Sequence, residues 1–231
     1  MGSLSVLVFG FSMIMIGVVS LLLMRSYFSK LFRRIKESHL AAEIKGPLDN
    51  FGVVAELVGN VRAVYSPVGG GRYISREKTV LLSYPPGSKG LWALLEAAHE
   101  AGHAAKPHPL TELLASTPLR LAISMVAPVA ISFFVGWRVP HQAISLALLA
   151  VLLSFPLIAL AAITQEEVGA CLFSRRWMCS YLDGQGYETY QGAVAKMIHA
   201  EVAFEILDGF ALLLFFEGAI VLFWGLGRTL I

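Results

Sequence analysis

The sequence contains little cysteine and little charge, and each shortage excludes a class of protein. Only two of its 231 residues are cysteines, Cys171 and Cys179, which is too few for the disulfide framework of a small secreted domain. Charged residues make up 15% of the chain and the net charge is only +2, so no basic surface for nucleic acid is indicated. The chain also lacks a glycine-rich phosphate loop and an internal repeat.

Hydrophobic residues, in contrast, are abundant. They make up 56% of the chain, and the mean hydropathy is +0.68, which is typical of a protein that crosses a membrane several times. Stretches long and apolar enough to cross a bilayer occur at residues 4–24, 121–137, 143–164 and 209–226. The first has the length of a full span and no basic residues before it, so we interpret it as a retained helix rather than a cleaved signal peptide.

Basic residues near the ends of these stretches predict an orientation. Arg25 and four more basic residues follow the first stretch within twelve positions, whereas the opposite ends carry only Arg138 and Arg228. Because cytoplasmic loops are enriched in lysine and arginine, both termini are expected outside and the polar segments in the cytoplasm. Glu217 lies inside the fourth stretch and is expected to face the helix bundle, because a carboxyl group is costly in lipid.

The most specific motif is His99-Glu100-Ala101-Gly102-His103, an HExxH sequence within a helix predicted over residues 90–105. Positions i and i+4 share one helix face, so His99 and His103 can bind a single zinc ion, Zn²⁺. Glu100 then stands beside the metal, where it can take a proton from zinc-bound water as a general base. The alternative is a helix whose histidines merely pack or cap.

Short strands are predicted before this helix, at residues 61–65, 73–75 and 79–83. If the last of these is an exposed edge, it can pair with an extended peptide and place the scissile bond over the metal, which makes Thr79, Val80, Leu81 and Leu82 candidate substrate-binding residues. The alternative is an ordinary covered strand. Ser88 is expected to cap the N-terminus of the zinc helix.

A catalytic zinc site needs a third protein ligand, and two adjacent carboxylates are candidates. Glu166 and Glu167 directly follow the third apolar stretch, where a membrane hairpin returns the chain to the level of the zinc helix. Neighbouring residues on a helix point about 100° apart, so only one of the two can face the metal. The alternative is that both are solvated carboxylates favoured by the helix dipole.

Several segments resemble a known family. Tyr73-Ile-Ser-Arg-Glu-Lys-Thr-Val-Leu-Leu-Ser83, Ala97-Ala-His-Glu-Ala-Gly-His-Ala104, a hydrophobic hairpin that ends in a Glu, and Gly192-Ala-Val-Ala-Lys-Met-Ile-His-Ala200 are similar to the neutral zinc metallopeptidases of prokaryotic membranes. These are membrane gluzincins, distantly similar to HtpX-like and CAAX prenyl proteases. The resemblance implies that the third ligand is a Glu followed three positions later by Ala, which selects Glu167 with Ala170. The family has Ser or Asp directly after that Ala, whereas Cys171 stands here.

The composition and the apolar stretches predict the fold class, a mainly α integral membrane protein. Its predicted parts are a transmembrane helix over 1–25, a cytoplasmic α+β metalloprotease region over 26–118 with the HExxH helix and a short β-hairpin, a transmembrane hairpin over 119–164, a cytoplasmic helical region over 165–208, and a fourth transmembrane helix over 209–231. The expected location is the plasma membrane of a prokaryote, as a multi-pass protein. The predicted function is that of a zinc metallopeptidase, a hydrolase that cleaves peptide or membrane-protein substrates at the cytoplasmic membrane interface. Whether the protein forms a homo-oligomer is left open.

Three other functions remain open on the sequence, one of them a zinc hydrolase that acts on a lipidated or non-peptide amide. Leu207-Asp208-Gly209, far downstream of HExxH, resembles the motif of site-2 intramembrane proteases, in which Asp208 would be the third ligand. A non-proteolytic membrane scaffold that binds zinc is the third alternative. Candidates to stabilise an oxyanion are His199, Tyr187 and Tyr190.

Overall fold

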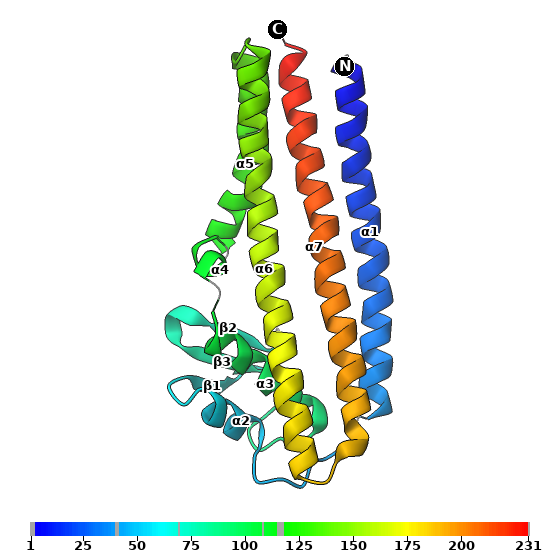
Figure 1. The fold of residues 1–231 in the computed structure, drawn as a ribbon, viewed down its shortest axis with the longest axis vertical. Helices are drawn as coiled ribbons and strands as arrows, with labels where there is room; N and C mark the ends of the chain where they lie inside the picture. Colours follow the sequence, from blue (N-terminus) through cyan, green and yellow to red (C-terminus); the bar gives the residue numbers. More distant parts are fainter. Residues whose placement is uncertain (1–2, 40–41, 69, 108, 115–117, 231) are drawn as a thin grey trace. The chain divides into compact units, whose positions relative to one another are not determined.

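A computed structural model describes the whole chain except residues 1–2, 40–41, 69, 108, 115–117 and 231. The described chain is mostly helical, with one small sheet (Figure 1). The elements are α1 (Ser3–Ser38), α2 (Asn50–Leu57), β1 (Arg62–Tyr65), β2 (Arg72–Ile74), β3 (Thr79–Leu82), α3 (Leu91–Ala105), α4 (Pro109–Leu114), α5 (Pro118–Arg138), α6 (Gln142–Gly184) and α7 (Gln191–Arg228), with single turns of 3-10 helix at Ser75–Glu77 and Glu188–Tyr190.

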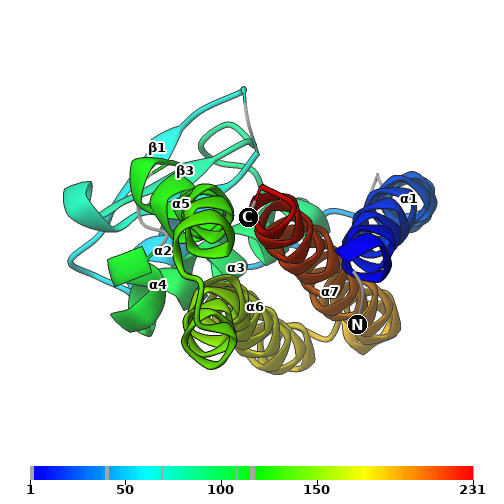
Figure 2. The ribbon, with the colours of Figure 1, turned by 90° about the horizontal axis from the view of Figure 1, so that it is seen from above.

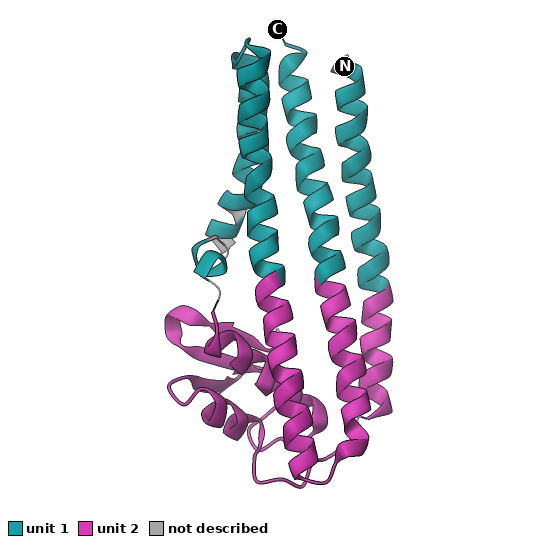
Figure 3. Ribbon diagram, viewed as in Figure 1, with its two compact units in different colours: residues 1–26, 109–164, 206–231 teal, residues 27–108, 165–205 magenta. Residues whose placement is uncertain are grey.

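The chain divides into two compact units, coloured separately in Figure 3. Unit 1 comprises residues 1–26, 109–164 and 206–231, and unit 2 comprises residues 27–108 and 165–205. Each of the helices α1, α6 and α7 contributes one part to unit 1 and another to unit 2. All three parts of the zinc hypothesis, namely the HExxH helix, the strands and the two candidate carboxylates, fall in unit 2.

Three helices are long and apolar enough to cross a membrane: Leu4–Ser38, Gln142–Gly184 and Glu188–Arg228. They contain three of the four predicted spans, and they support a membrane-embedded protein. The remaining prediction, at 121–137, falls in α5, where the apolar helix Ile123–Arg138 is shorter and contains Pro128. Four spans are therefore not established by the structure.

Within unit 1, helices α1 and α7 lie side by side and approach through glycines (Figure 2). A Cβ atom added to Gly10 would lie 2.7 Å from the backbone N of Leu222, and one added to Gly17 would lie 2.8 Å from the carbonyl O of Ala211. Such contacts are closer than a real Cβ tolerates, so these backbones pack directly on one another. Small residues at helix interfaces are typical of packing in lipid, where apolar burial gives no driving force.

The sheet of unit 2 corrects the predicted edge strand. Its order is β1-β3-β2, with β1 parallel and β2 antiparallel to β3, so β3 is hydrogen-bonded on both sides. Val80 and Leu82 are buried, as expected for a strand whose apolar run is covered. The prediction that Thr79, Val80, Leu81 and Leu82 offer a free edge to substrate is wrong, because β1 and β2 already occupy the ladder positions of β3.

Helix α3 is the centre of the unit 2 core. Leu91, Leu94 and several alanines of α3 are buried in one cluster with Met178 of α6 and Ile198 of α7. The residue before its first turn is Gly90, without a side-chain cap, while the Ser88 hydroxyl donates to the carbonyl of Pro85. The predicted Ser88 cap is therefore wrong, because that hydroxyl serves the preceding turn instead.

Candidate metal centre

The HExxH motif lies in the second half of α3, as the sequence predicts, and its two histidines face the same way. The ring centroids of His99 and His103 are 4.9 Å apart, and their Nε2 atoms are 3.2 Å apart. One helical turn of spacing brings the rings together in this way. Gly102 between them lets α6 approach, because an added Cβ would lie 3.1 Å from Cα of Ala170.

Glu167 of α6 completes a triangle with the two histidines. Its Oε2 lies 3.5 Å from His99 Nε2 and 3.3 Å from His103 Nε2. Three ligand atoms of a tetrahedral zinc ion, at bonds of about 2.0–2.1 Å, stand about 3.3 Å apart. The three observed separations agree with that value, so the donor set and its spacing fit a zinc ion.

Two arrangements account for this triangle. Without a metal ion, the histidines hydrogen-bond to Glu167, and both Nε2 atoms lie near one carboxylate oxygen. A cation at the centre satisfies all three atoms as lone-pair donors, which is the usual role of neutral imidazole and carboxylate.

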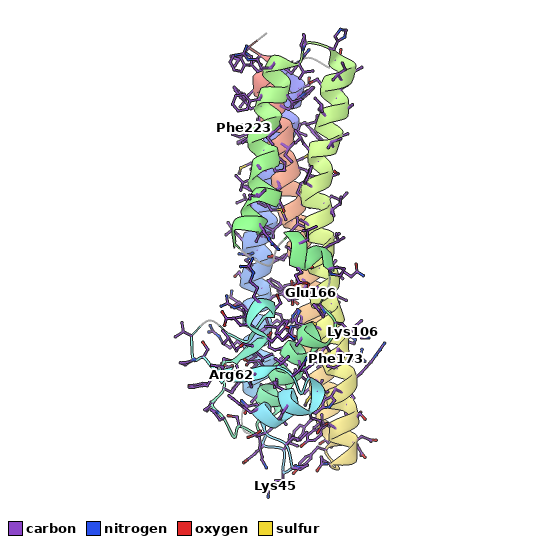
Figure 4. The ribbon with its side chains drawn as sticks, turned by 90° about the vertical axis from the view of Figure 1, so that its left-hand side faces the viewer. Lys45, Arg62, Lys106, Glu166, Phe173 and Phe223 are labelled. Atoms are coloured by element: carbon purple, nitrogen blue, oxygen red, sulfur yellow. The ribbon has the colours of Figure 1, made fainter. Side chains whose placement is uncertain are left out.

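Glu166 takes a different position from its neighbour. Its Oε1 lies 3.4 Å from His103 Nδ1, on the side of the ring away from the triangle, and its Oε2 is buried without a hydrogen-bond partner among the described residues. It lines a second cavity with Lys106 and Phe173, which lie nearby in Figure 4. A carboxylate on the second ring nitrogen orients a metal-binding histidine, and Glu166 suits that role. The assignment of Glu167 as the ligand stays a prediction that these distances favour.

A cavity of about 330 Å³ opens beside the triangle. Glu100 lines it and is 7% exposed, so it is a buried carboxyl next to the candidate metal position. The loop before β2 also lines it, and a Cβ on Gly71 would lie only 2.9 Å from Glu100 Oε1 and 2.7 Å from Glu96 Oε1. Glu96 is held in place because it accepts hydrogen bonds from the backbone N and the hydroxyl of Ser83.

The protonation of these groups follows from their surroundings. Burial raises the pKa of Glu100 above its usual range, although His99 and His103 act against this. Burial lowers the pKa of His103, but its hydrogen bonds with Glu166 and Glu167 outweigh burial and raise the pKa to about 10. The raised pKa makes the carboxylate of Glu100 a stronger base than that of an exposed glutamate.

The three predicted oxyanion residues are not brought to this cavity. His199 Nε2 lies 3.2 Å from Arg175 Nη1, on the exposed surface. Tyr187 stacks on Tyr190, and its hydroxyl accepts a hydrogen bond from the backbone N of Lys45. None of the three is among the described residues that line the cavity, so this prediction is wrong. Both tyrosines belong to the turn between α6 and α7, where they close the connection rather than face the metal position.

Asp208, the alternative third ligand, has another partner. Its two oxygens accept hydrogen bonds from Nε and Nη2 of Arg25 at 2.9 and 3.1 Å, and both residues belong to unit 1. The site-2 alternative also needs HExxH inside a membrane span. Helix α3 is not among the long apolar helices of the described chain.

Sequence reasoning did not single out Glu201, which lines the same cavity from α7. It lies beside Cys171, whose Sγ is 3.8 Å both from Glu201 Oε2 and from Nδ1 of His99. The available signal was weak: Met197, Glu201 and Glu205 repeat at the helical spacing of four and share one face. Nothing local shows that this face meets the HExxH helix.

Comparison with known proteins does not assign this chain to a family. No family model, no curated protein and no solved structure matches this chain. What the fold and site define is therefore a mostly helical protein with three helices suited to crossing a membrane and a His₂Glu cluster suited to a metal ion. The likeness to membrane gluzincins stays a hypothesis carried by the quoted residues.

Proposed function

We propose that this protein is an integral membrane zinc-dependent endopeptidase, with His99, His103 and Glu167 as the zinc ligands. The observation that carries the proposal is the triangle of donor atoms, 3.2 to 3.5 Å on each edge, beside a cavity lined by the buried carboxyl of Glu100. Catalytic zinc sites have three protein ligands and an open position, and this cluster offers three.

Each residue has a definite task in this proposal. Zinc, when bound, would act as a Lewis acid towards the peptide carbonyl. Glu100 accepts a proton from the attacking water and passes it to the leaving amine, a cycle that its raised pKa favours. Glu166 holds the ring of His103 from the Nδ1 side, and Glu96 keeps the cavity wall in place through Ser83.

The substrate strand is assigned to β2 rather than β3. Strand β2 lies at one edge of the sheet, and Gly70 and Gly71 directly before it line the cavity. An extended peptide that pairs with this edge would gain main-chain hydrogen bonds in any sequence, which suits an endopeptidase. Glycine at position 71 leaves room for Glu96 and Glu100, and a larger residue there would intrude on both.

The proposed topology has four spans in a prokaryotic plasma membrane, with both termini outside and the site facing the cytoplasm. The three long apolar helices support membrane insertion, and α5 would supply the additional span. The lysine and arginine residues that follow the first span support the orientation. A reporter enzyme that is active only in the cytoplasm is expected to be inactive when it is fused to the loop between α5 and α6. Activity of this fusion would contradict the topology.

The test begins with the metal content of the purified protein in detergent. One zinc per chain, held at the site of His99, His103 and Glu167, is expected in the wild type and in Glu166→Ala, and this zinc is expected to be lost in His99→Ala and Glu167→Ala. Zinc that survives His99→Ala would remove the site from consideration. Cleavage is then measured with peptide and membrane-protein substrates: a protein that keeps zinc but cleaves none of them belongs to the alternative class of zinc-binding scaffolds.

A further inference from the structure

A second set of metal-binding atoms adjoins the first and shares one histidine with it. His99 Nδ1, Cys171 Sγ and a carboxylate oxygen of Glu201 lie within 4.8 Å of one another. They come from α3, α6 and α7, so three separate elements of unit 2 converge on one point. Cys171 and Glu201 also line the cavity, through which an ion can reach them.

The spacing of these atoms suits a cation bound by sulfur. With a zinc–sulfur bond of about 2.3 Å and bonds of about 2.0 Å to nitrogen and oxygen, tetrahedral geometry places sulfur about 3.5 Å from the other two ligand atoms. The observed separations are 3.8 Å from Sγ to His99 Nδ1 and 3.8 Å from Sγ to Glu201 Oε2. Shifts of a few tenths of an ångström would bring the sulfur to these separations, and the donor atoms of His99 and Glu201 lie within 4.8 Å of each other.

Long contacts hold these atoms in the protein alone. The Cys171 thiol donates its one proton to the carboxylate of Glu201 across 3.8 Å, and Nδ1 of His99 lies equally far from the sulfur. Acidic side chains also dominate the cavity: five glutamates line it together with one lysine, Lys36, among the described residues. A cation would engage the sulfur, the nitrogen and the carboxylate together and offset the negative charge.

We propose that His99, Cys171 and Glu201 form a second, thiolate-containing site for a divalent cation such as Zn²⁺ or Co²⁺. Binding releases two protons to solvent, the thiol proton of Cys171 and, when Nε2 of His99 already holds the first cation, the ring proton at Nδ1, so that an imidazolate bridges the two ions. A soft sulfur ligand beside nitrogen and oxygen selects borderline ions such as these over Mg²⁺ or Ca²⁺. The site does not depend on peptidase activity, because it is defined by its own three donor atoms.

The shared histidine couples the two positions. The first cation would use Nε2 of His99 and the second Nδ1, so two double charges would stand on one imidazole ring and repel each other. The second cation is therefore expected to bind more weakly than the first. Loss of the first site through His103→Ala is expected to strengthen binding at the second, because that repulsion disappears.

The test is a Co²⁺ titration of the full chain, purified in detergent with metal removed, followed by absorption spectroscopy. A cobalt–thiolate bond gives a charge-transfer band in the near ultraviolet, which histidine and glutamate ligands do not give. The wild type is expected to bind two Co²⁺ ions, with the band growing in with the second. Cys171→Ser is expected to bind one ion without the band, and Glu201→Gln to weaken the second ion at least tenfold.

Matched controls make the result decisive. Cys179→Ser removes the other cysteine and is expected to behave as the wild type, and His103→Ala is expected to lose the first ion but keep the band. A wild type that saturates without the band, or a band that survives Cys171→Ser, would overturn the second site. Failure of the peptidase proposal is seen separately, as absence of cleavage in a protein whose first ion is present.

Discussion

Unit 1 and unit 2 contain parts of the same three helices, yet different side chains pack those helices in each. In unit 1, backbones meet at glycines such as Gly10 and Gly218, while large apolar side chains such as Phe134 and Leu157 stay exposed. In unit 2, large side chains such as Leu94 and Met178 are fully buried.

The comparison separates two ways of holding helices together. Burial of apolar area drives packing in water, where a leucine contributes about 1.5–3 kcal/mol. In lipid that force is absent, and close backbone approach through small residues replaces it. The candidate metal centre lies in unit 2, where large apolar side chains are buried.

The largest expected difference between the units is in catalysis. Glu100→Gln in unit 2 is expected to lower kcat at least about a thousandfold with zinc retained, because the amide cannot accept the proton. Asp208→Asn in unit 1 is the matched control and is expected to cleave normally, since Asp208 pairs with Arg25. Cleavage and metal content are measured on the same preparations. Loss of zinc in Asp208→Asn would favour the site-2 alternative instead.

Removing volume should damage unit 2 most. Leu94→Ala is expected to lower the free energy of unfolding by about 2–5 kcal/mol, because Leu94 is fully buried on α3, the helix that carries HExxH. Ile123→Ala in unit 1 is the control, since that side chain is 57% exposed and leaves no cavity. Thermal unfolding in detergent measures both. Equal losses in the two variants would remove the distinction between the units.

Adding volume should damage unit 1 most. Gly218→Ala is expected to cost about 1–3 kcal/mol, because its Cβ would lie 2.8 Å from the carbonyl O of Gly10 and the backbone N of Ile14. Gly169→Ala in unit 2 is the control, since an added Cβ there meets nothing within 4 Å. Thermal unfolding in detergent measures both variants. A Gly218→Ala variant with unchanged stability would show that α1 and α7 pack less closely than the 2.8 Å contacts indicate.

The smallest effect concerns pH and is confined to unit 2. Because the pKa of His103 is about 10, both ring nitrogens carry a proton at neutral pH, and zinc must displace the proton on Nε2. Zinc affinity is therefore expected to rise about tenfold for each pH unit per proton released, as long as the pH stays below that pKa. Calorimetric zinc titrations in buffers of different ionisation enthalpy count the released protons. An affinity that does not change between pH 6 and pH 8 would contradict this.

Much of the fold was predictable because it depends on local patterns. Apolar stretches of sufficient length predicted three long helices, and the period of α3 predicted that His99 and His103 share a face. Strands were also predicted near their observed positions, because β-branched and aromatic residues between turn residues are a local signal. Their order was not predictable, since pairing of β1 with β3 depends on a chain reversal between them.

The sequence by itself determined the chemistry that this protein has available: an HExxH helix, two carboxylates after a long apolar stretch and a chain suited to a membrane. Only the tertiary structure decided which atoms meet. In the tertiary structure, Glu167 lies near Nε2 of both histidines and Glu166 lies near Nδ1 of His103. Strand β3 is the central strand of the sheet, and Glu201 lies beside Cys171. The reason is physical: side-chain direction along one helix follows from its period, but contact between α3, α6 and α7 follows from how their buried faces pack.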